Sequence, residues 1–369
     1  MKLKAKVSWL MGTVQQSLFP YLDESLPSPL TEPEKRLVKI LELVQIERHV
    51  PASRRRQWLG RPIKEREAIA RAFVAKALLR YQYTSSLRNA LLSSQNLRII
   101  CGFRQRSEVP SEATFSRAFS EYARAGLGTI VHDALVKEHL STELIGHVSR
   151  DSTALAAREK PAKKVKRPKV AKKRGRPTQG DVRPPAERKR LDRQRNQTAE
   201  EALQDLPKVC DRGVKKNAKG YTETWNGYKL HLDVNDFGLP ISAVLTSASL
   251  HDSQVAIPLM KLTASKVASC YDLMDAAYDA AQIREQSKAL GHVPIIDRNP
   301  RGQKEIIPMA PHEAARYNER SSAERCNGRF KDEFGGRNVQ VRGPDKVMMH
   351  AMFGIVTLFA DQLLKVTGC

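Results

Sequence analysis

The chain has 369 residues, and its 63 lysines and arginines against 40 aspartates and glutamates give a formal net charge of +23. Its hydrophobic content of 41% and mean hydropathy of −0.48 are typical of a soluble protein, and its length accommodates two domains. The most apolar run, residues 351–360, is too short to span a bilayer and predicts a buried helix, so no membrane contact is expected. Folding does not require the positive excess, which indicates a polyanionic partner.

Five cysteines are scattered along the chain without any Cys-x-x-Cys pair. This distribution argues against a structural zinc site and against a disulfide framework. We therefore expect reduced thiols and a cytoplasmic protein.

Residues 30–140 predict a helical bundle. Thr31 and Glu34 have the spacing of a capping box at the start of a first helix. A second helix is expected over residues 64–82 and a third over 85–102, each with apolar residues at helical spacing. Short turns between them suit a compact arrangement.

A further helix is expected over Ser111–Arg124. Its inward residues would be Phe115, Phe119 and Tyr122, and its outward residues include Arg117 and Arg124. Two interpretations remain open, because amphipathicity fits both: a helix that reads DNA and a helix that only supports the bundle.

A strongly basic tract follows between residues 158 and 195, where 17 basic residues face four acidic ones. With few large apolar residues it cannot bury a core, so we expect a disordered insertion at about 158–222. Within it, Lys173, Arg174 and Arg176 flank a glycine in a pattern that resembles an AT-hook, which lies in the minor groove of A·T-rich DNA. General neutralisation of phosphates by the same side chains is the alternative.

Beyond about residue 145 the pattern changes to strands that alternate with helices. The expected strands are 146–152, 227–234, 239–247, 270–275 and 293–297, and the expected helices are 252–265, 279–290, 312–334 and 345–366. This order predicts a mixed α/β sheet.

One stretch of the last third carries an unusual stripe of polar side chains: Tyr317, Arg320, Glu324 and Lys331. At roughly 100° per residue these positions fall within about 60° on one helix face. A carboxylate flanked by cations suits a site that holds a metal ion together with a phosphodiester. The alternative is that Ser321 and Glu324 form a capping box at a helix start.

The spacing of this stripe resembles the signature around the catalytic glutamate of bacterial insertion-sequence DDE transposases. Asp151 in Val-Ser-Arg-Asp-Ser-Thr, and Asp275 in Asp-Ala-Ala-Tyr-Asp, resemble the two aspartates of that family. The resemblance covers roughly residues 145–365. It implies a ribonuclease-H-like catalytic domain over 144–369, preceded by a helical DNA-end-binding domain over 1–143.

The resemblance also implies the roles of individual residues. Asp151, Asp275 and Glu324 would be the catalytic acids and would hold two Mg²⁺ ions, for which Mn²⁺ can substitute. Tyr317, Arg320 and Lys331 would contact the DNA near the cut.

The implied function is that of a DNA transposase, which binds the terminal inverted repeats of its element, hydrolyses a phosphodiester and transfers the strand. It would work as a homodimer on double-stranded DNA, in the cytoplasm of a bacterium and at its nucleoid. Two alternatives stay open: a transposase-derived DNA-binding protein without catalysis, and a related metal-dependent nuclease that does not join DNA.

Other aspartates compete for these roles. Strand alternation places Asp272 on the opposite face from Asp275, and Asp279 is expected to cap the following helix. Asp233 is the second choice for the first aspartate. Asp252 is expected to cap a helix in preference to binding a metal.

Overall fold

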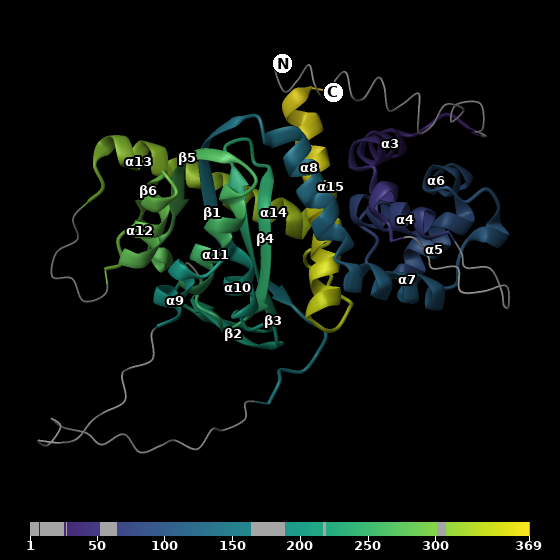
Figure 1. Ribbon diagram of the computed structural model, residues 1–369. Helices are drawn as coiled ribbons and strands as arrows, with labels where there is room; N and C mark the ends of the chain where they lie inside the picture. The colour runs from purple at the N-terminus through teal and green to yellow at the C-terminus, as the bar shows by residue number, and fades with distance from the viewer. Residues whose placement is uncertain are drawn as a thin grey trace, which may run out of the picture.

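The computed structural model describes residues 28–51, 65–163, 189–216, 219–300 and 308–368, together with Val7 and Leu26. Figure 1 shows a bundle of helices beside a sheet that is covered by further helices, with the long helix α15 between the two parts. The mixed α/β core preceded by helices confirms the fold class expected from the sequence.

The helical part contains α3 and the helices that follow it up to the sheet. Their bounds are α3 Glu32–Val44, α4 Arg66–Leu78, α5 Thr84–Ser93, α6 Gln95–Cys101, α7 Glu112–Ala125 and α8 Leu127–Leu140. The capping box of Thr31 and Glu34 is present at the start of α3. Ser111 caps α7, which buries Phe115, Phe119 and Tyr122 as expected.

The third predicted helix is wrong in one respect, because the chain forms α5 and α6 in place of one helix over 85–102. Ser94 ends α5 in an extended conformation and accepts a hydrogen bond from the Leu97 backbone N–H, so it caps α6. A serine hydroxyl that satisfies a free backbone donor favours this break over a continuous helix.

The sheet has the strand order β2-β3-β1-β5-β6, and β4 also pairs with β3. Its strands are β1 Leu144–Ala156, β2 Asp211–Lys216, β3 Thr222–Asn235, β4 Pro240–Ser247, β5 Ala268–Met274 and β6 Val293–Ile296. The strand β1 is antiparallel to β3 and parallel to β5, and β5 is parallel to β6. Mixed pairing of this kind places β1 in the middle of the sheet, with a partner on each side.

The predicted insertion at 158–222 is wrong over the part that the structure describes. Residues 189–216 form α9 Arg190–Asn196, α10 Ala199–Gln204 and the edge strand β2. Specific contacts order this part, since Arg190 and Arg193 both bond Asp205 within the insertion, and Gln194 donates to the backbone of Gln254 outside it. Composition does not reveal such contacts, because it does not say which groups meet in the fold.

Helices on the sheet complete the second part. They are α11 Ser253–Ala264, α12 Ala281–Ala289, α13 Pro311–Tyr317, α14 Ser321–Glu333 and α15 Pro344–Thr367. The single helix expected over 312–334 is wrong, because the 3₁₀ turn Asn318–Arg320 separates α13 from α14.

The helix α15 joins the helical part to the sheet, and most of its residues are buried, as its apolar run predicted. Its Phe353 ring lies 5.2 Å from the Phe73 ring of α4, measured between centroids. It also approaches α8 closely, since a Cβ added at Gly128 would lie 2.4 Å from the Met352 Cβ. α15 is long and apolar enough to cross a membrane, yet 83% of its apolar window is buried inside the protein, as in a core helix.

Candidate active site

Asp151 and Asp275 lie side by side at the point where β1 loses its parallel partner. In the register of β1 with β5, Arg150 pairs with Met274, and β5 ends there. The next residue of each strand is one of the two aspartates. Asp151 is not at a strand end as expected, because β1 continues to Ala156 on its antiparallel pairing with β3.

The environment of these two carboxyls disfavours their ionised forms. Burial raises the pKa of Asp151 to about 6, and the charge of Asp275 adds to this rise. Burial also raises the pKa of Asp275. The charge of Arg320 opposes both shifts, yet neither carboxylate forms an ion pair in the described part of the chain. Two acids that share a partly buried position without a paired cation are a favourable place for a positive ligand.

Helix α14 is fixed to β1 by two side-chain hydrogen bonds. The Ser322 hydroxyl donates to the Ser149 hydroxyl at 3.1 Å, and the Asn327 amide donates to the Asp151 carboxylate at 3.0 Å. Asn327 lies about one turn after Glu324, so the residue that holds Asp151 and the predicted third acid lie on neighbouring parts of one helix face.

Glu324 points toward a cation and does not complete a cluster of carboxylates. Arg320 donates to Glu324 at 2.5 Å, and within the described ranges no three His, Cys, Asp or Glu side chains gather closely enough to share a metal ion. The alternative role for Glu324 does not hold, because Arg320 occupies the N-cap position of α14 and no side chain caps it. Ser321 instead accepts a hydrogen bond from Arg325.

Of the three residues predicted to contact DNA near the cut, two lie together beside the acids. The Arg320 guanidinium lies 5.6 Å from the centre of the Tyr317 ring. Lys331 is half-buried farther along α14. Burial and the nearby charges of Lys215 and Arg337 lower its pKa, while the charge of Asp151 acts in the opposite direction.

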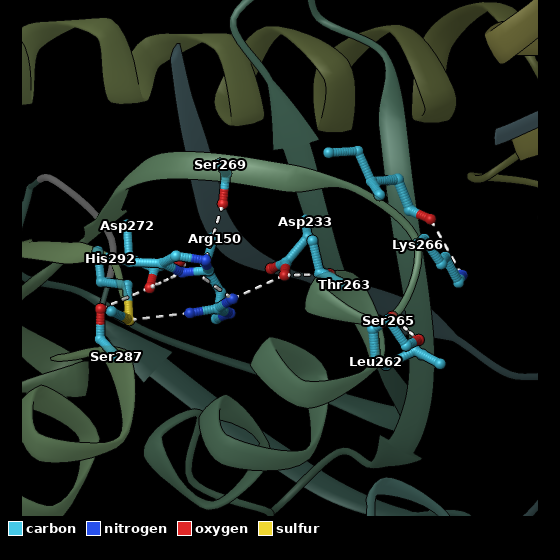
Figure 2. A network of polar contacts seen from close by, with 12 residues as sticks. Arg150, Asp233, Leu262, Thr263, Ser265, Lys266, Ser269, Asp272, Ser287 and His292 are labelled. Atoms are coloured by element: carbon cyan, nitrogen blue, oxygen red, sulfur yellow. Dashed lines mark hydrogen bonds and ion pairs between the residues drawn. The ribbon is translucent and has the colours of Figure 1, made fainter. Parts of the chain in front are cut away.

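A buried network of charges lies on the other face of the same strands (Figure 2). Arg150 donates to Asp233 at 2.6 Å and lies 3.8 Å from Asp272, and all three side chains are almost fully buried. Asp233 also accepts a hydrogen bond from Thr263, and Asp272 accepts one from Ser287.

This network decides between the competing aspartates. Asp272 lies on the face opposite to Asp275, as expected, and its carboxylate is held by Arg150, Ser287 and His292, whose Nδ1 lies 3.1 Å away. Asp233 is fully buried against Arg150, so the second choice for the first aspartate is not free to bind a ligand.

The remaining two aspartates differ from expectation. Asp252 occupies the N-cap position of α11, but its side chain makes no cap and pairs with Lys229 at 2.9 Å. Its charge reaches the acid pair and contributes to the raised pKa of Asp275. Asp279 does not cap α12, whose N-cap is Ala280, and it pairs with Arg284 at 2.9 Å.

Sequence reasoning missed Arg150 and Asn327. A signal existed for Asn327, since it lies three residues after Glu324 and shares its helix face. No local signal identifies Arg150, whose partner Asp233 is 83 positions away. The AT-hook residues Lys173, Arg174 and Arg176 lie outside the described residues.

Comparison with known protein families gives two matches. The model of the family described as Transposase DDE domain matches residues 151–359, more than half of the chain. The model described as Transposase domain (DUF772) matches residues 22–121, which include α3 to most of α7. No curated protein matches the chain significantly. The first match begins at Asp151 and contains Asp275 and Glu324.

Proposed function

The chain belongs to the family of transposases with a DDE domain, and on that premise we propose that it cuts and joins DNA at Asp151, Asp275 and Glu324. The observation that carries the proposal is that Asp151 and Asp275 directly follow the last paired residues of the parallel strands β1 and β5, and that neither forms an ion pair in the described part of the chain. The alternative of a binding protein without catalysis leaves this costly arrangement without a purpose, because a binder gains nothing from acids near phosphate.

The residues of the site fit divalent cations. Aspartate and glutamate oxygens are the ligands that Mg²⁺ and Mn²⁺ prefer. The buried hydroxyl of Tyr278 has no hydrogen-bond partner in the described part of the chain, and burial together with the charges of Asp252, Asp151 and Asp275 raises its pKa. Asp151, Asp275 and Glu324 would together hold the two Mg²⁺ ions. Bound there, the metals would activate the attacking oxygen and neutralise the leaving one.

The chain's own residues prepare this site. Asn327 fixes the carboxylate of Asp151, and Arg320 holds the carboxylate of Glu324 through a hydrogen bond. When it is not engaged by Glu324, the guanidinium of Arg320 would be available to bind a DNA phosphate. Tyr317 would then stack against a nucleotide near the cut, and Lys331 would bind a phosphate.

The substrate in this proposal is double-stranded DNA that carries the terminal inverted repeats of the element. The helical part would bind those ends, with α7 as the reading helix, since Arg117 and Arg124 are exposed on its outer face. Two ends must be paired for transposition, so the proposed active form is a homodimer on DNA.

The decisive experiment is cleavage of a DNA fragment that carries the gene's own flanks, with Mg²⁺ and then with EDTA. Asp151→Asn, Asp275→Asn and Glu324→Gln should each lower the cleavage rate by at least about a thousandfold while DNA binding persists. Asp279→Asn is the matched control, because Asp279 follows Asp275 by four residues and is paired with Arg284. It should cut at a rate close to wild type.

Each outcome discriminates between the functions. Cleavage followed by joined products supports the transposase, and cleavage without joining supports the nuclease. Tight binding without cutting under either Mg²⁺ or Mn²⁺ would reject the catalytic proposal and favour the binding protein.

A further inference from the structure

A cleft of about 570 Å³ lies between the helical part and the turn that connects α14 to α15. Its floor is apolar: the Phe353 ring of α15 lies 5.2 Å from Phe73 and 6.0 Å from Phe119, between centroids. Both matched family segments contribute to its walls, since α4 and α7 form one side and α14 and α15 the other.

The rim of this cleft carries unneutralised positive charge. Six cations line it, and none of them forms an ion pair in the described part of the chain: Lys76, Arg80, Arg158, Lys331, Arg342 and Lys346. Asp332 is the one carboxylate among its described lining residues, and it already pairs with Arg337 at 2.5 Å. Clustered cations without protein counter-charges indicate an anionic ligand.

Aromatic rings at the cleft narrow the class of ligand. Tyr83 lies at its edge and is 49% exposed although it is a large ring, whereas Tyr81 is partly buried and packs against the core. An exposed ring beside a cationic groove suits single-stranded nucleic acid, because a base can stack on the ring while phosphates contact the cations. A cleft of this volume admits a few nucleotides and excludes a double helix.

Lys331 connects the cleft with the candidate active site. It lines the cleft and lies one turn after Asn327 on α14, whose amide donates to the Asp151 carboxylate. A strand whose scissile phosphate lies at Asp151 would therefore pass Lys331 and enter the cleft.

We propose that this cleft binds unpaired nucleotides of the DNA strand that is cut, adjacent to the scissile phosphate. The proposal rests on the function proposed above. It predicts that the end of the duplex is opened beside the cut, and that the helical part contributes to holding the opened strand in addition to binding DNA ends.

Binding of short oligonucleotides to the full chain tests this without catalysis. The probes are fluorescein-labelled (dT)₆ and a labelled blunt hairpin duplex, followed by anisotropy in EDTA. The cleft variant Arg80→Gln/Arg342→Gln/Lys346→Gln is compared with Lys137→Gln/Lys208→Gln/Lys288→Gln. The control residues are exposed, lie outside the cleft and form no ion pair in the described ranges, so both variants lose the same charge.

The cleft variant should bind (dT)₆ at least about tenfold more weakly, and its salt dependence should flatten by about 2 in log–log slope, since each lost phosphate contact contributes about 0.7. The affinity of the control variant for both probes should stay within about twofold of wild type. The affinity of the cleft variant for the duplex should also stay within about twofold of wild type. Equal losses in the two variants, or an equal loss of duplex and single-strand binding by the cleft variant, would overturn the proposal.

Stacking is tested separately at Tyr83. Tyr83→Leu should weaken (dT)₆ binding about tenfold, and Tyr83→Phe should retain it, because stacking needs the ring and not the hydroxyl. Unchanged binding by Tyr83→Leu would remove the ring from the site. Cleavage of the element's ends by the wild-type protein is measured in parallel. If the wild type cuts but the cleft variant binds (dT)₆ as tightly as wild type, only the proposed role of the cleft is rejected. If the wild type does not cut, the proposed transposase function is rejected.

Discussion

Two neighbouring residues of β1, Arg150 and Asp151, lie on opposite faces of the same strands. The two faces differ in whether their acidic side chains have a paired cation. On the Arg150 face, Asp233 and Asp272 are buried but supplied with a guanidinium, hydroxyl donors and a histidine (Figure 2). On the Asp151 face, Asp151 and Asp275 lie together and form no ion pair within the described ranges.

The pKa values of Asp272 and Asp151 express this difference, although burial also raises the pKa of Asp233 despite its bond to Arg150. Burial alone would raise the pKa of Asp272, yet hydrogen bonding to His292 and Ser287 and the charge of Arg150 hold it below its usual value. Burial raises the pKa of Asp151 to about 6, because its partners compensate less. Buried acids that have cationic and hydrogen-bonding partners stabilise the fold. Buried acids without a paired cation destabilise it, and a bound cation can relieve that cost.

The largest expected effect is the loss of Arg150. Arg150→Met leaves Asp233 and Asp272 buried without their shared cation, which should lower the free energy of unfolding by about 3–5 kcal/mol. Denaturant unfolding measures it. Arg337→Met, which removes the exposed partner of Asp332, is the control and should cost less than about 1 kcal/mol. Similar losses in the two variants would contradict a stabilising role for the Arg150 face.

A smaller effect of opposite sign is expected at Asp151. Its folded pKa of about 6 exceeds the ordinary 3.8, so the stability it contributes is present below pH 3.8 and is lost as the pH rises through about 6. In EDTA, Asp151→Asn should therefore match wild type near pH 4 and exceed its unfolding free energy by about 2–3 kcal/mol at pH 8. Addition of Mg²⁺ should stabilise wild type only.

Asp272→Asn is the matched comparison for that prediction, because Asp272 lies on the neighbouring strand with compensated charge. It should be less stable than wild type at pH 8. If both asparagine variants change stability in the same direction at this pH, the distinction between the two faces fails.

The smallest expected effect concerns Asn327. Asn327→Leu removes the hydrogen bond to Asp151, which should lower the unfolding free energy by about 1 kcal/mol and raise the pKa of Asp151 further. The difference in unfolding free energy from Asp151→Asn is followed against pH, and the midpoint of this curve measures that shift. Ser322→Ala breaks the other contact of α14 with β1 and should cost a similar free energy without moving the midpoint.

Local patterns in the sequence were sufficient for most elements. Alternation and helical spacing predicted β4, β5 and β6 and the helices α7, α11 and α15 close to their bounds, because each pattern reflects burial of one face, whereas β3 begins earlier and α4 ends earlier than expected. The fold class and the family followed from the order of these elements and from the residues that resemble the family's motifs.

Tertiary structure alone decided which charges meet. The pairing of Arg150 with Asp233, the bond from Asn327 to Asp151 and the order of residues 189–216 each depend on partners far away in the chain. The same holds for the basic cleft, whose walls come from both parts of the protein. Periodicity records whether a side chain is buried, but not which charge lies opposite to it, and that choice separates the acids that have a paired cation from those that have none.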